Sequence, residues 1–474
     1  MAKFYITTTL PYVNAAPHIG FALEIVQADI IARYRKLVGD EVIFNTGTDE
    51  HGIKIYRKAL EEKKDPQEYV DEYAKKFASL KEVLNLSYTN FIRTTDEHHK
   101  KAVEAFWEKC FEAGDIYKKL YPVKYCVGCE LEKTASELDG DGRCLIHPHL
   151  EIETIEEENY FFRWSKYQNE LLKLYETRPD FVVPETRLHE IKNFVARGLE
   201  DFSISRRKEK MPWGIAVPGD PEHVMYVWFD ALVNYISTLG WPEDEKTFND
   251  FWPGVQLAGK DNLRQQSAMW QAMLMSAGLP ISKQILIHGF ITSGGEKMSK
   301  SLGNVIDPVE LVEKYGTDAL RYFLARHIHP HEDSDFTIER FEDAYNGNLA
   351  NGLGNFAARV MQLAQTYLPE SVRVEEEKFP VTYSEALDNY DYESAINYIF
   401  QRIGAADLKI TETEPFKLVK TDPEKGKKII SELVGELYLV VRLLNPFMPE
   451  TSEKIKKAVA ENKKPETLFQ RIER

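Results

Sequence analysis

The first part of the chain alternates short apolar runs with a stretch of amphipathic periodicity. Residues 4–9 are typical of a β-strand, and residues 19–37 place apolar side chains three and four positions apart, as a helix requires. Residues 41–45 form the next β-rich run. A strand, a helix and a second strand in this order predict an α/β fold built on a parallel, doubly wound sheet.

This alternation stops near residue 116 and resumes near residue 225. The interruption at 116–224 contains a cluster of cysteines and an acidic patch at 151–158, and we interpret it as an inserted domain. The sheet pattern then returns in three runs, at residues 224–229, 255–258 and 284–288. We therefore expect one sheet domain in two halves, residues 1–115 and 225–325.

After about residue 340 the β-rich runs end and helical periodicity dominates. Apolar residues step by three and four through Leu349, Leu353, Phe356, Val360, Leu363 and Tyr367, and again through Leu433, Leu437, Val440 and Leu444. Such seams predict a helical bundle over residues 346–474, joined to the sheet domain by a linker at 326–345.

Composition places the chain among globular proteins of more than one domain, with 474 residues of which 43% are hydrophobic and 29% charged. We find no apolar run of about 18 residues and no signal peptide, so we expect no membrane partner. Four cysteines do not make a disulfide framework, which favours a cytoplasmic location.

The net charge of −16 argues weakly against a nucleic-acid partner. Residues 451–474 oppose it with seven Lys or Arg against four Glu, although a solvated tail explains them equally well.

Unusual residues gather where the predicted strands end. The loops that follow four strands contain His18 and Gly20, the segment 46–52, the segment 259–261, and the lysine-rich segment 297–301. Ligands bind outside the carboxyl ends of the strands in open parallel sheets, so we expect these loops to meet at one rim.

His18 and Gly20 stand at the start of the predicted helix 19–37. A helix N-terminus attracts phosphate through its free N–H groups and its dipole. Gly20 lets a nucleotide approach the backbone, and His18 can donate a hydrogen bond to a phosphate oxygen. A histidine that only caps the helix explains the same pattern.

The segment Lys297-Met298-Ser299-Lys300-Ser301 follows Gly294-Gly295 and the last predicted strand. Two lysines three positions apart can neutralise a triphosphate and stabilise the charge that develops in a phosphoryl-transfer transition state. A solvated lysine-rich turn is the simpler alternative, and the five-residue pattern with its Leu-Gly-Asn continuation argues against it.

Cys126, Cys129, Cys144 and His147 form two short pairs of metal-ligand type, Cys-x2-Cys and Cys-x2-His. Two such pairs can supply four tetrahedral ligands, which suits one structural zinc ion. We see no neighbouring arrangement for a catalytic water. Cys110 stands apart, and we expect it to be a small buried hydrophobic residue.

Taken together, the His-x-Gly element and the lysine loop resemble those of the class I aminoacyl-tRNA synthetases. The segments Leu10-Pro11-Tyr12, 48–52 and 226–231 are similar to those of the methionyl-tRNA synthetase family, and the resemblance covers nearly the whole chain. It implies a Rossmann-like catalytic domain, ATP with Mg²⁺, L-methionine and tRNA(Met). It also implies a zinc knuckle at about 121–150 in the connective insertion, a stem-contact linker at 326–345 and an anticodon-binding bundle at 346–474.

The resemblance also assigns roles to individual residues. It places catalysis on His18, Lys297 and Lys300, and ATP binding on His18, Gly20, Phe21, Gly259, Asp261, Met298 and Lys300. It places methionine binding on Leu10, Tyr12, Asp49, Trp228, Ala231, Leu232 and Tyr235, and anticodon binding on Asn355, Arg359 and Phe416. Arg206 matches an arginine near the reacting groups. From spacing alone, the aromatic residues are equally typical of a core, and Arg206 of an exposed surface.

Three positions depart from the family pattern. Phe21 replaces a second histidine, Gln266 stands where some members have a histidine, and Phe416 takes the apparent place of a stacking tryptophan. We expect Phe21 to pack under the helix while backbone N–H groups and the lysines bind the phosphates. The loss of a histidine also leaves open an alternative, a non-catalytic tRNA-binding relative.

Other members of the class fit less well. Leucyl-, isoleucyl- and valyl-type enzymes have a larger editing insertion than 116–224, and cysteinyl-type enzymes hold zinc in the active site. Few residues follow the predicted bundle, and some relatives append a dimerising domain there. We therefore expect a monomer.

Overall fold

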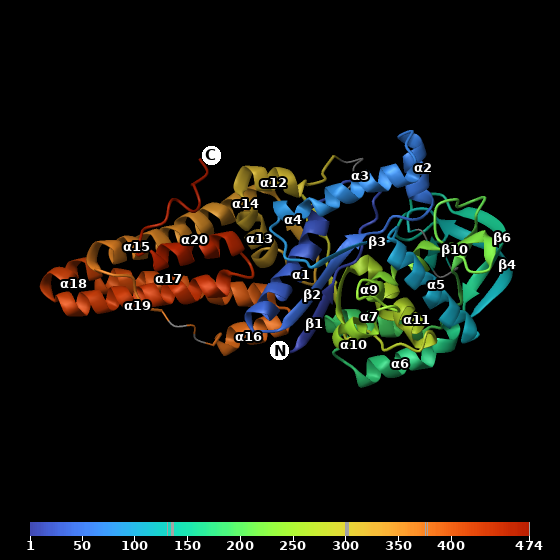
Figure 1. Ribbon diagram of the computed structural model, residues 1–474. Coiled ribbons are helices and arrows are strands. Elements are labelled where there is room, and N and C mark those ends of the chain that lie inside the picture. The colour runs from blue at the N-terminus through green and yellow to red at the C-terminus, as the bar shows by residue number, and fades with distance from the viewer. Residues whose placement is uncertain (130, 134–136, 299–302, 375, 377, 474) are drawn as a thin grey trace.

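The computed structural model describes the chain except residues 130, 134–136, 299–302, 375, 377 and 474. The molecule is elongated, with a sheet-containing part at one end and a helical bundle at the other (Figure 1). Among the described residues, no helix combines the length and the apolarity needed to cross a membrane.

The sheet-containing part is organised by six parallel strands in the order β3-β2-β1-β12-β13-β7. These strands are β1 (Lys3–Thr7), β2 (Glu41–Thr48), β3 (Asn90–Arg93), β7 (Val182–Val183), β12 (Val255–Gly259) and β13 (Gln284–His288). The predicted parallel α/β fold is confirmed. Helix α1 (Ile19–Leu37) also begins and ends where its periodicity predicts.

Helices pack around this sheet, and loops at its rim connect them to the strands. In the first part of the chain they are α2 (Ile53–Glu61), α3 (Pro66–Ala78), α4 (Leu80–Val83) and α5 (Glu97–Glu112). Further along they are α6 (Gln168–Thr177), α7 (Glu185–Ala196), α8 (Val227–Ala231), α9 (Asn234–Ser237), α10 (Glu245–Phe251) and α11 (Trp270–Ser276).

Two antiparallel sheets occupy the interruption of the parallel pattern. One contains β4 (Ile116–Cys126), β5 (Leu131–Glu132), β6 (Glu153–Phe162) and β8 (Phe202–Ser203). The other contains β9 (Ser205–Arg207), β10 (Ala216–Val217) and β11 (Asp220–Met225). Strand β7 also comes from this part of the chain, yet it pairs with β13 at the edge of the parallel sheet.

The prediction of a parallel strand at residues 224–229 is wrong in two respects. Only Val224 and Met225 belong to a strand, and they pair antiparallel with β9 instead of joining the parallel sheet. Tyr226 is the N-cap residue of α8, and residues 227–229 lie in that helix. A short, fully buried apolar run carries no periodicity that separates a strand from a helix, so local pattern could not decide between them.

A third small sheet leads from the parallel sheet toward the bundle. It contains β14 (Ile291–Ser293), β15 (Glu296–Lys297) and β16 (Ser334–Phe336). Helices α12 (Pro308–Tyr315) and α13 (Thr317–Arg326) lie between β15 and β16 in the sequence, and α14 (Ile338–Ala344) connects β16 to the helical part.

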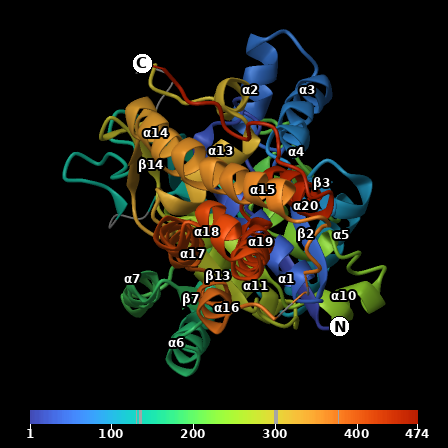
Figure 2. The ribbon, with the colours of Figure 1, turned by 90° about the vertical axis from the view of Figure 1, so that its left-hand side faces the viewer.

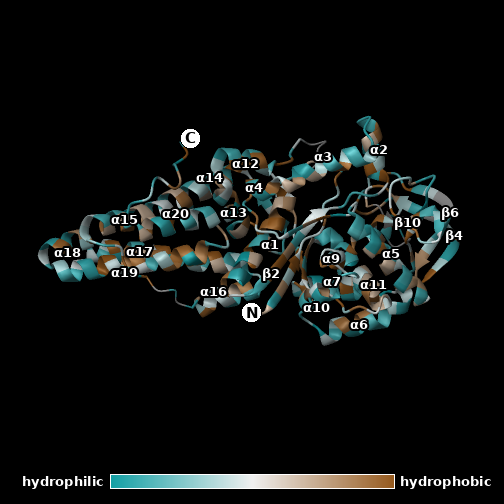
Figure 3. Cartoon of the chain, in the orientation of Figure 1, coloured by the Kyte–Doolittle hydropathy of each residue, from teal (hydrophilic) through white to brown (hydrophobic). Residues whose placement is uncertain are grey.

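The C-terminal part is helical, as predicted. A π-helical stretch (Tyr345–Gly354) leads into α15 (Asn355–Tyr367), α16 (Val381–Asp388), α17 (Tyr392–Thr413), α18 (Pro415–Thr421), α19 (Pro423–Leu444) and α20 (Pro449–Ala460). Figure 2 looks toward the end of this bundle, where the helices lie side by side. Both hydrophobic and hydrophilic residues occur along the bundle helices, as expected of helices that bury one face (Figure 3).

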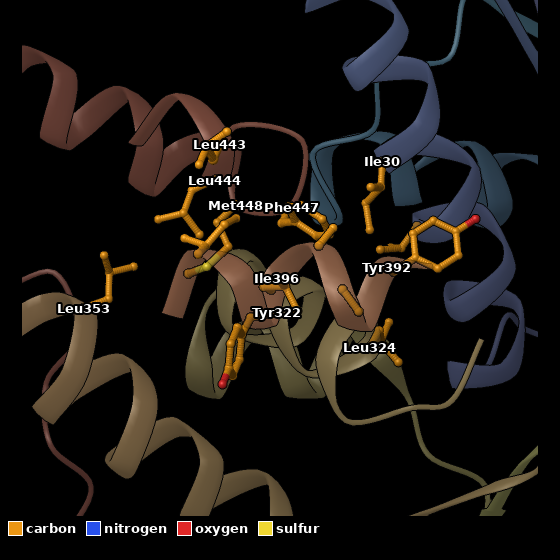
Figure 4. Packing of buried hydrophobic residues seen from close by; sticks show 14 of the residues in the cluster. Ile30, Tyr322, Leu324, Leu353, Tyr392, Ile396, Leu443, Leu444, Phe447 and Met448 are labelled. Atoms are coloured by element: carbon orange, nitrogen blue, oxygen red, sulfur yellow. The ribbon is translucent and has the colours of Figure 1, made fainter. Parts of the chain in front are cut away.

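The bundle and the sheet domain share one hydrophobic core. Ile30 of α1, Tyr322 of α13 and Leu353, Ile396 and Leu444 of the helical part belong to the same cluster of buried residues (Figure 4). The predicted seam residues Leu433, Leu437 and Val440 are buried in it as well.

A buried arginine stands at this junction. Arg321 of α13 is completely buried, and its guanidinium donates to the Asp29 carboxylate at 2.7 Å. It also donates to the carbonyls of Leu84, Pro446 and Phe447 at 2.8–3.0 Å. Burial alone would raise the pKa of Asp29, but Arg321 and Arg33 outweigh it and lower that pKa. The contact therefore joins α1, α13 and the turn before α20.

Replacing this arginine should destabilise the junction strongly. Arg321→Met removes one of the two arginines that pair with Asp29 and leaves three buried carbonyls without this donor, and we expect a loss of about 3 kcal/mol in the free energy of unfolding. Urea denaturation followed by circular dichroism measures it. The matched control is Lys314→Met, an exposed lysine of α12, which should change stability by no more than about 0.5 kcal/mol. Equal effects of the two substitutions would contradict the assignment.

Candidate active site

The loops at the carboxyl ends of the strands meet at one cleft of about 550 Å³. Its lining includes Leu10, Tyr12, His18, Gly20, Phe21, Asp49, Trp228, Ala231, Leu232, Tyr235, Gly259, Asp261, Gln266, Lys297 and Met298. The structure thus brings together the residues predicted for ATP and methionine, apart from Lys300, which lies outside the described residues.

The N-terminus of α1 opens into this cleft. His18 is the N-cap residue, and its Nδ1 accepts a hydrogen bond from the Gly20 N–H at 3.0 Å, which leaves the proton on Nε2. The ring is accessible from the cleft, yet desolvation by the surrounding protein lowers the pKa of His18. A Cβ on Gly20 would come within 2.9 Å of this ring. His18 is therefore a neutral donor whose position requires glycine at residue 20.

Phe21 fills a packing position in the first turn of α1. Its ring meets Phe77 of α3 edge-on, with 5.2 Å between the ring centres. This contact joins α1 to α3 at the side of the cleft, and it explains why an apolar residue is stable in the first turn of α1.

A charged pair that sequence reasoning missed lies at the inner end of the cleft. The Glu24 carboxylate accepts hydrogen bonds from the Thr9 N–H at 2.6 Å and from the Thr9 hydroxyl at 2.7 Å. It also contacts His288 Nε2 at 2.9 Å. The other ring nitrogen of His288 donates to the Gly289 carbonyl at 2.7 Å. Burial alone would lower the pKa of His288, but Glu24 outweighs it and raises that pKa. The feature of the sequence that pointed to Glu24 is its position one helical turn after Gly20.

Gly259 and Asp261 lie beside this pair at the end of β12. Desolvation raises the pKa of Asp261, and the nearby Glu24 charge acts in the same direction. The Asp261 carboxylate is accessible from the cleft and offers an acceptor to a hydroxyl group of a ligand.

An apolar pocket forms in the cleft where α8 and α9 meet. Trp228, Ala231, Leu232 and Tyr235 line it, and Gln266 donates to the Tyr235 hydroxyl oxygen at 2.6 Å. Gln266 is therefore part of the pocket wall. Such a surface suits an unbranched thioether side chain.

Asp49 brings a carboxylate to this apolar pocket. The two residues that follow it in the chain are fixed by contacts outside the pocket. Glu50 forms a two-point ion pair with Arg93 at 2.7 and 2.9 Å. The His51 ring contacts the buried Asp230 of α8 at 2.6 Å. Because residues 50 and 51 are held in this way, Asp49 is directed to the cleft, where it lies among the lining residues.

Asp230 is the centre of a second network that the sequence did not reveal. Its carboxylate also contacts His99 of α5 at 2.9 Å, and His99 contacts the Ser237 hydroxyl at 2.9 Å. Burial alone would raise the pKa of Asp230, but the two histidines outweigh it and lower that pKa. The network joins the loop of Asp49 to the helix of Trp228.

Arg206 lies behind the pocket and is buried, not exposed as the simpler interpretation of the sequence expects. Its guanidinium stacks 4.3 Å from the centre of the Tyr226 ring and donates to Ser203 Oγ at 2.6 Å. It therefore supports the residue that precedes α8.

Lys297 lies at the end of the β14–β15 hairpin and lines the cleft. Its ammonium lies 5.5 Å from the centre of the Phe290 ring, and Met298 packs against the main core. Lys297 and the N-terminus of α1 thus line the same cleft although they are far apart in the sequence.

The four predicted metal ligands converge beside the cleft. Cys126, Cys129, Cys144 and His147 place their ligand atoms within 4.8 Å of one another. Desolvation, aided by nearby lysines, lowers the pKa of His147 to about 4, so its ring is neutral. The arrangement is a Cys3His set able to hold a metal ion. Cys110 is buried elsewhere, as expected, and burial raises the pKa of its thiol to about 12.

The residues predicted to bind an anticodon lie on the bundle, away from the cleft lining. Asn355 is exposed at the start of α15, and Arg359 donates to the Asp407 carboxylate of α17 at 2.6 Å. Phe416 of α18 is 39% exposed, which is unusual for a phenylalanine and leaves its face accessible.

The fold and the cleft define a class I tRNA synthetase. The family model described as "tRNA synthetases class I (M)" matches residues 4–144 and 130–361. A methionine–tRNA ligase from Thermotoga maritima is 42% identical over 98% of this chain and 76% of its own length. One from a Nostoc species is 41% identical over 95% of this chain and 89% of its own length.

Solved structures agree with the sequence matches. A structure of Mycobacterium tuberculosis methionyl-tRNA synthetase in complex with methionyl-adenylate is 36% identical, with a TM-score of 0.91 over 97% of this chain and 94% of that one. The apo form of that synthetase superimposes with a TM-score of 0.84. This chain belongs to the methionine–tRNA ligase family.

The Asp230 network gives a pH-dependent prediction. The folded pKa of Asp230 lies below its unfolded value of about 4, so its contribution is complete above about pH 4 and is lost as pH falls toward the folded pKa. We expect Asp230→Asn to destabilise the protein by about 1–3 kcal/mol near pH 7, and this difference to shrink below about pH 4.

Urea midpoints measured from about pH 7 to about pH 3 test this. Asp250→Asn, at an exposed position of α10, is the matched control and should show no such pH-dependent difference. A constant effect of Asp230→Asn at every pH would show that the charge of the carboxylate is not what stabilises the network.

Proposed function

We propose that this chain joins L-methionine to tRNA(Met) in two steps, with ATP as the energy source. The observation that carries the proposal is the single cleft that combines an apolar pocket and the Asp49 carboxylate with the N-terminus of α1 and Lys297. Membership in the methionine–tRNA ligase family supports the same activity.

In the first step, a carboxylate oxygen of methionine attacks the α-phosphorus of ATP. The new P–O bond gives methionyl-adenylate, and the bond to the β-phosphate oxygen breaks to release pyrophosphate. No protein nucleophile takes part, so the contribution of the protein is orientation and charge stabilisation. His18 Nε2–H and Lys297 would contact the phosphates beside the N-terminus of α1, whose dipole favours negative charge although its first N–H groups already donate within the protein. Lys300 would be a further cation of the same loop. Mg²⁺ bound with ATP would neutralise part of the phosphate charge.

Different residues of the cleft would contact the two substrates. Trp228, Ala231, Leu232, Tyr235, Leu10 and Tyr12 would surround the methionine side chain, and Asp49 would pair with its α-ammonium. Gly259 allows close approach of the nucleoside, and Asp261 would accept from a ribose hydroxyl. With Phe21 packed on Phe77, phosphate binding rests on one imidazole, the helix N-terminus and the lysines.

In the second step, the 2′-hydroxyl of the terminal tRNA ribose attacks the carbonyl carbon of the adenylate, and AMP leaves. We assign the connective part, residues 116–224, and the linker at 326–345 to the acceptor arm of the tRNA. The bundle at 346–474 would read the CAU anticodon through Asn355 and Arg359, with Phe416 stacking on a base. A monomer suffices for these contacts.

The Cys3His cluster fits one structural zinc ion. Three sulfur ligands and one neutral imidazole match the preference of Zn²⁺, and four protein ligands leave no position for a substrate. Cys129 and His147 also line the cleft, so the ion would stabilise one of its walls.

Methionine-dependent exchange of pyrophosphate into ATP tests the proposed activity. Lys297→Ala should lower the exchange rate on the order of a hundredfold, because it removes a cation that meets charge in the transition state. Lys300→Ala should act similarly. The exposed Lys314→Ala, on α12, is the control and should leave exchange unchanged. Absence of exchange in the unchanged protein, with tRNA binding retained, would favour a non-catalytic relative.

Metal content tests the knuckle independently of activity. We expect about one zinc per chain by mass spectrometry, and Cys144→Ser should lose most of it because a serine hydroxyl is a poor ligand for Zn²⁺. Cys110→Ala is the matched control, since Cys110 is buried away from the cluster. Equal zinc in the two variants would exclude the assigned ligands.

A further inference from the structure

The turn that follows α13 contacts two of the loops that build the cleft. Its last residues form β16, which pairs in parallel with β14 of the lysine hairpin. Phe336 at the end of β16 is completely buried and packs on Phe323 and Phe341, with 5.1 and 5.9 Å between ring centres. The position of β16 is therefore set by the hydrophobic core, not by the cleft.

Asp335 of β16 holds the turn of the lysine hairpin. One of its carboxylate oxygens accepts from the Gly295 N–H at 2.7 Å and from the Thr292 hydroxyl at 2.9 Å. Thr292 lies directly across from Asp335 in the β14–β16 register, and Gly294 and Gly295 form the turn in the left-handed region. A carboxylate that accepts two hydrogen bonds makes a strong contact, because charged acceptors bind more tightly than neutral ones.

Asp333 makes a second contact of the same kind. Its carboxylate accepts from the Phe290 N–H at 2.9 Å and pairs with Lys260 at 2.6 Å. Lys260 follows β12, and its ammonium lies 4.7 Å from the centre of the Phe290 ring. Asp333 thus joins the loop after β12 to the start of the lysine hairpin.

The geometry of these contacts points to a function. We propose that Asp335, supported by Asp333, is a positioning residue that places the lysine hairpin, and with it Lys297, against the polyphosphate of ATP. This inference rests on the proposed function. Neither carboxylate is among the described residues that line the cleft, so each acts through the hairpin instead of touching the nucleotide. The apolar pocket is built on α8, α9 and the loop of Asp49, and the contacts described for these two carboxylates do not reach those elements.

This separation predicts a kinetic split that a general structural role would not give. In pyrophosphate exchange, Asp335→Ala should lower kcat/KM for ATP on the order of tenfold or more, because small displacements of positioned groups are costly. The KM for methionine should change by less than about twofold. Asp335→Asn should retain part of the activity, since its amide oxygen can still accept from the Gly295 N–H.

Two further measurements isolate the contact. Glu332→Gln, at an exposed carboxylate of the same turn, is the matched control and should leave both parameters unchanged. Thr292→Val removes the hydroxyl donor, and its effect combined with Asp335→Ala should be smaller than the sum of the two, since both variants lose the Thr292–Asp335 hydrogen bond. Hydrogen exchange should accelerate over residues 291–297 in Asp335→Ala, but not in β12 and β13.

The outcomes separate this inference from the proposed function. If the unchanged protein shows no methionine-dependent exchange, the proposed activity fails and no role toward ATP remains. If the unchanged protein is active, but Asp335→Ala keeps its kcat/KM for ATP, the inference is overturned. An equal rise of both KM values, with a lower melting temperature, would also overturn it by showing a general structural role.

Discussion

The buried guanidinium of Arg321 holds three distant parts of the chain in one place. It contacts Asp29 on the helix that begins at the cleft, the Leu84 carbonyl that follows α4, and two carbonyls in the turn before α20. Removing an arginine from water is costly, so the structure depends on each of these acceptors being present. Because α1 is tied to the bundle in this way, the N-terminus that faces the cleft has a defined position relative to the helices that would bind a tRNA.

The helix that carries Arg321 also leads to the hairpin of Lys297 on the cleft. From α13 the chain turns through Asp333 and enters β16, where Asp335 holds the lysine hairpin. The N-terminus of α1 and the segment after this hairpin meet directly as well, because the Ile19 N–H donates to the Ile306 carbonyl at 3.0 Å. His18 and Lys297 are thus placed by one continuous set of contacts, which suits a reaction that depends on orientation and not on a protein nucleophile.

The cleft keeps its charges in separate places. His18 is neutral at the helix N-terminus, Lys297 supplies positive charge across from it, and the Glu24–His288 pair lies at the inner end with its charges opposed. Asp49 is directed to the apolar pocket because Glu50 and His51 are held by Arg93 and Asp230. Phe21 is accommodated as a packing residue between α1 and α3.

The amino-acid sequence by itself determined the features that depend on local pattern. Helix α1, strands β12 and β13, the seams of the bundle and the four metal ligands follow from periodicity and spacing. The residues around the cleft were found because they follow strands or resemble family motifs. Only the tertiary structure decided that 227–231 is helical, that two residues at 182–183 complete the sheet, and that Glu24, Asp230 and Asp335 support the cleft. Each of these depends on partners tens to hundreds of residues away, and a contact across such a separation leaves no periodic trace in the sequence.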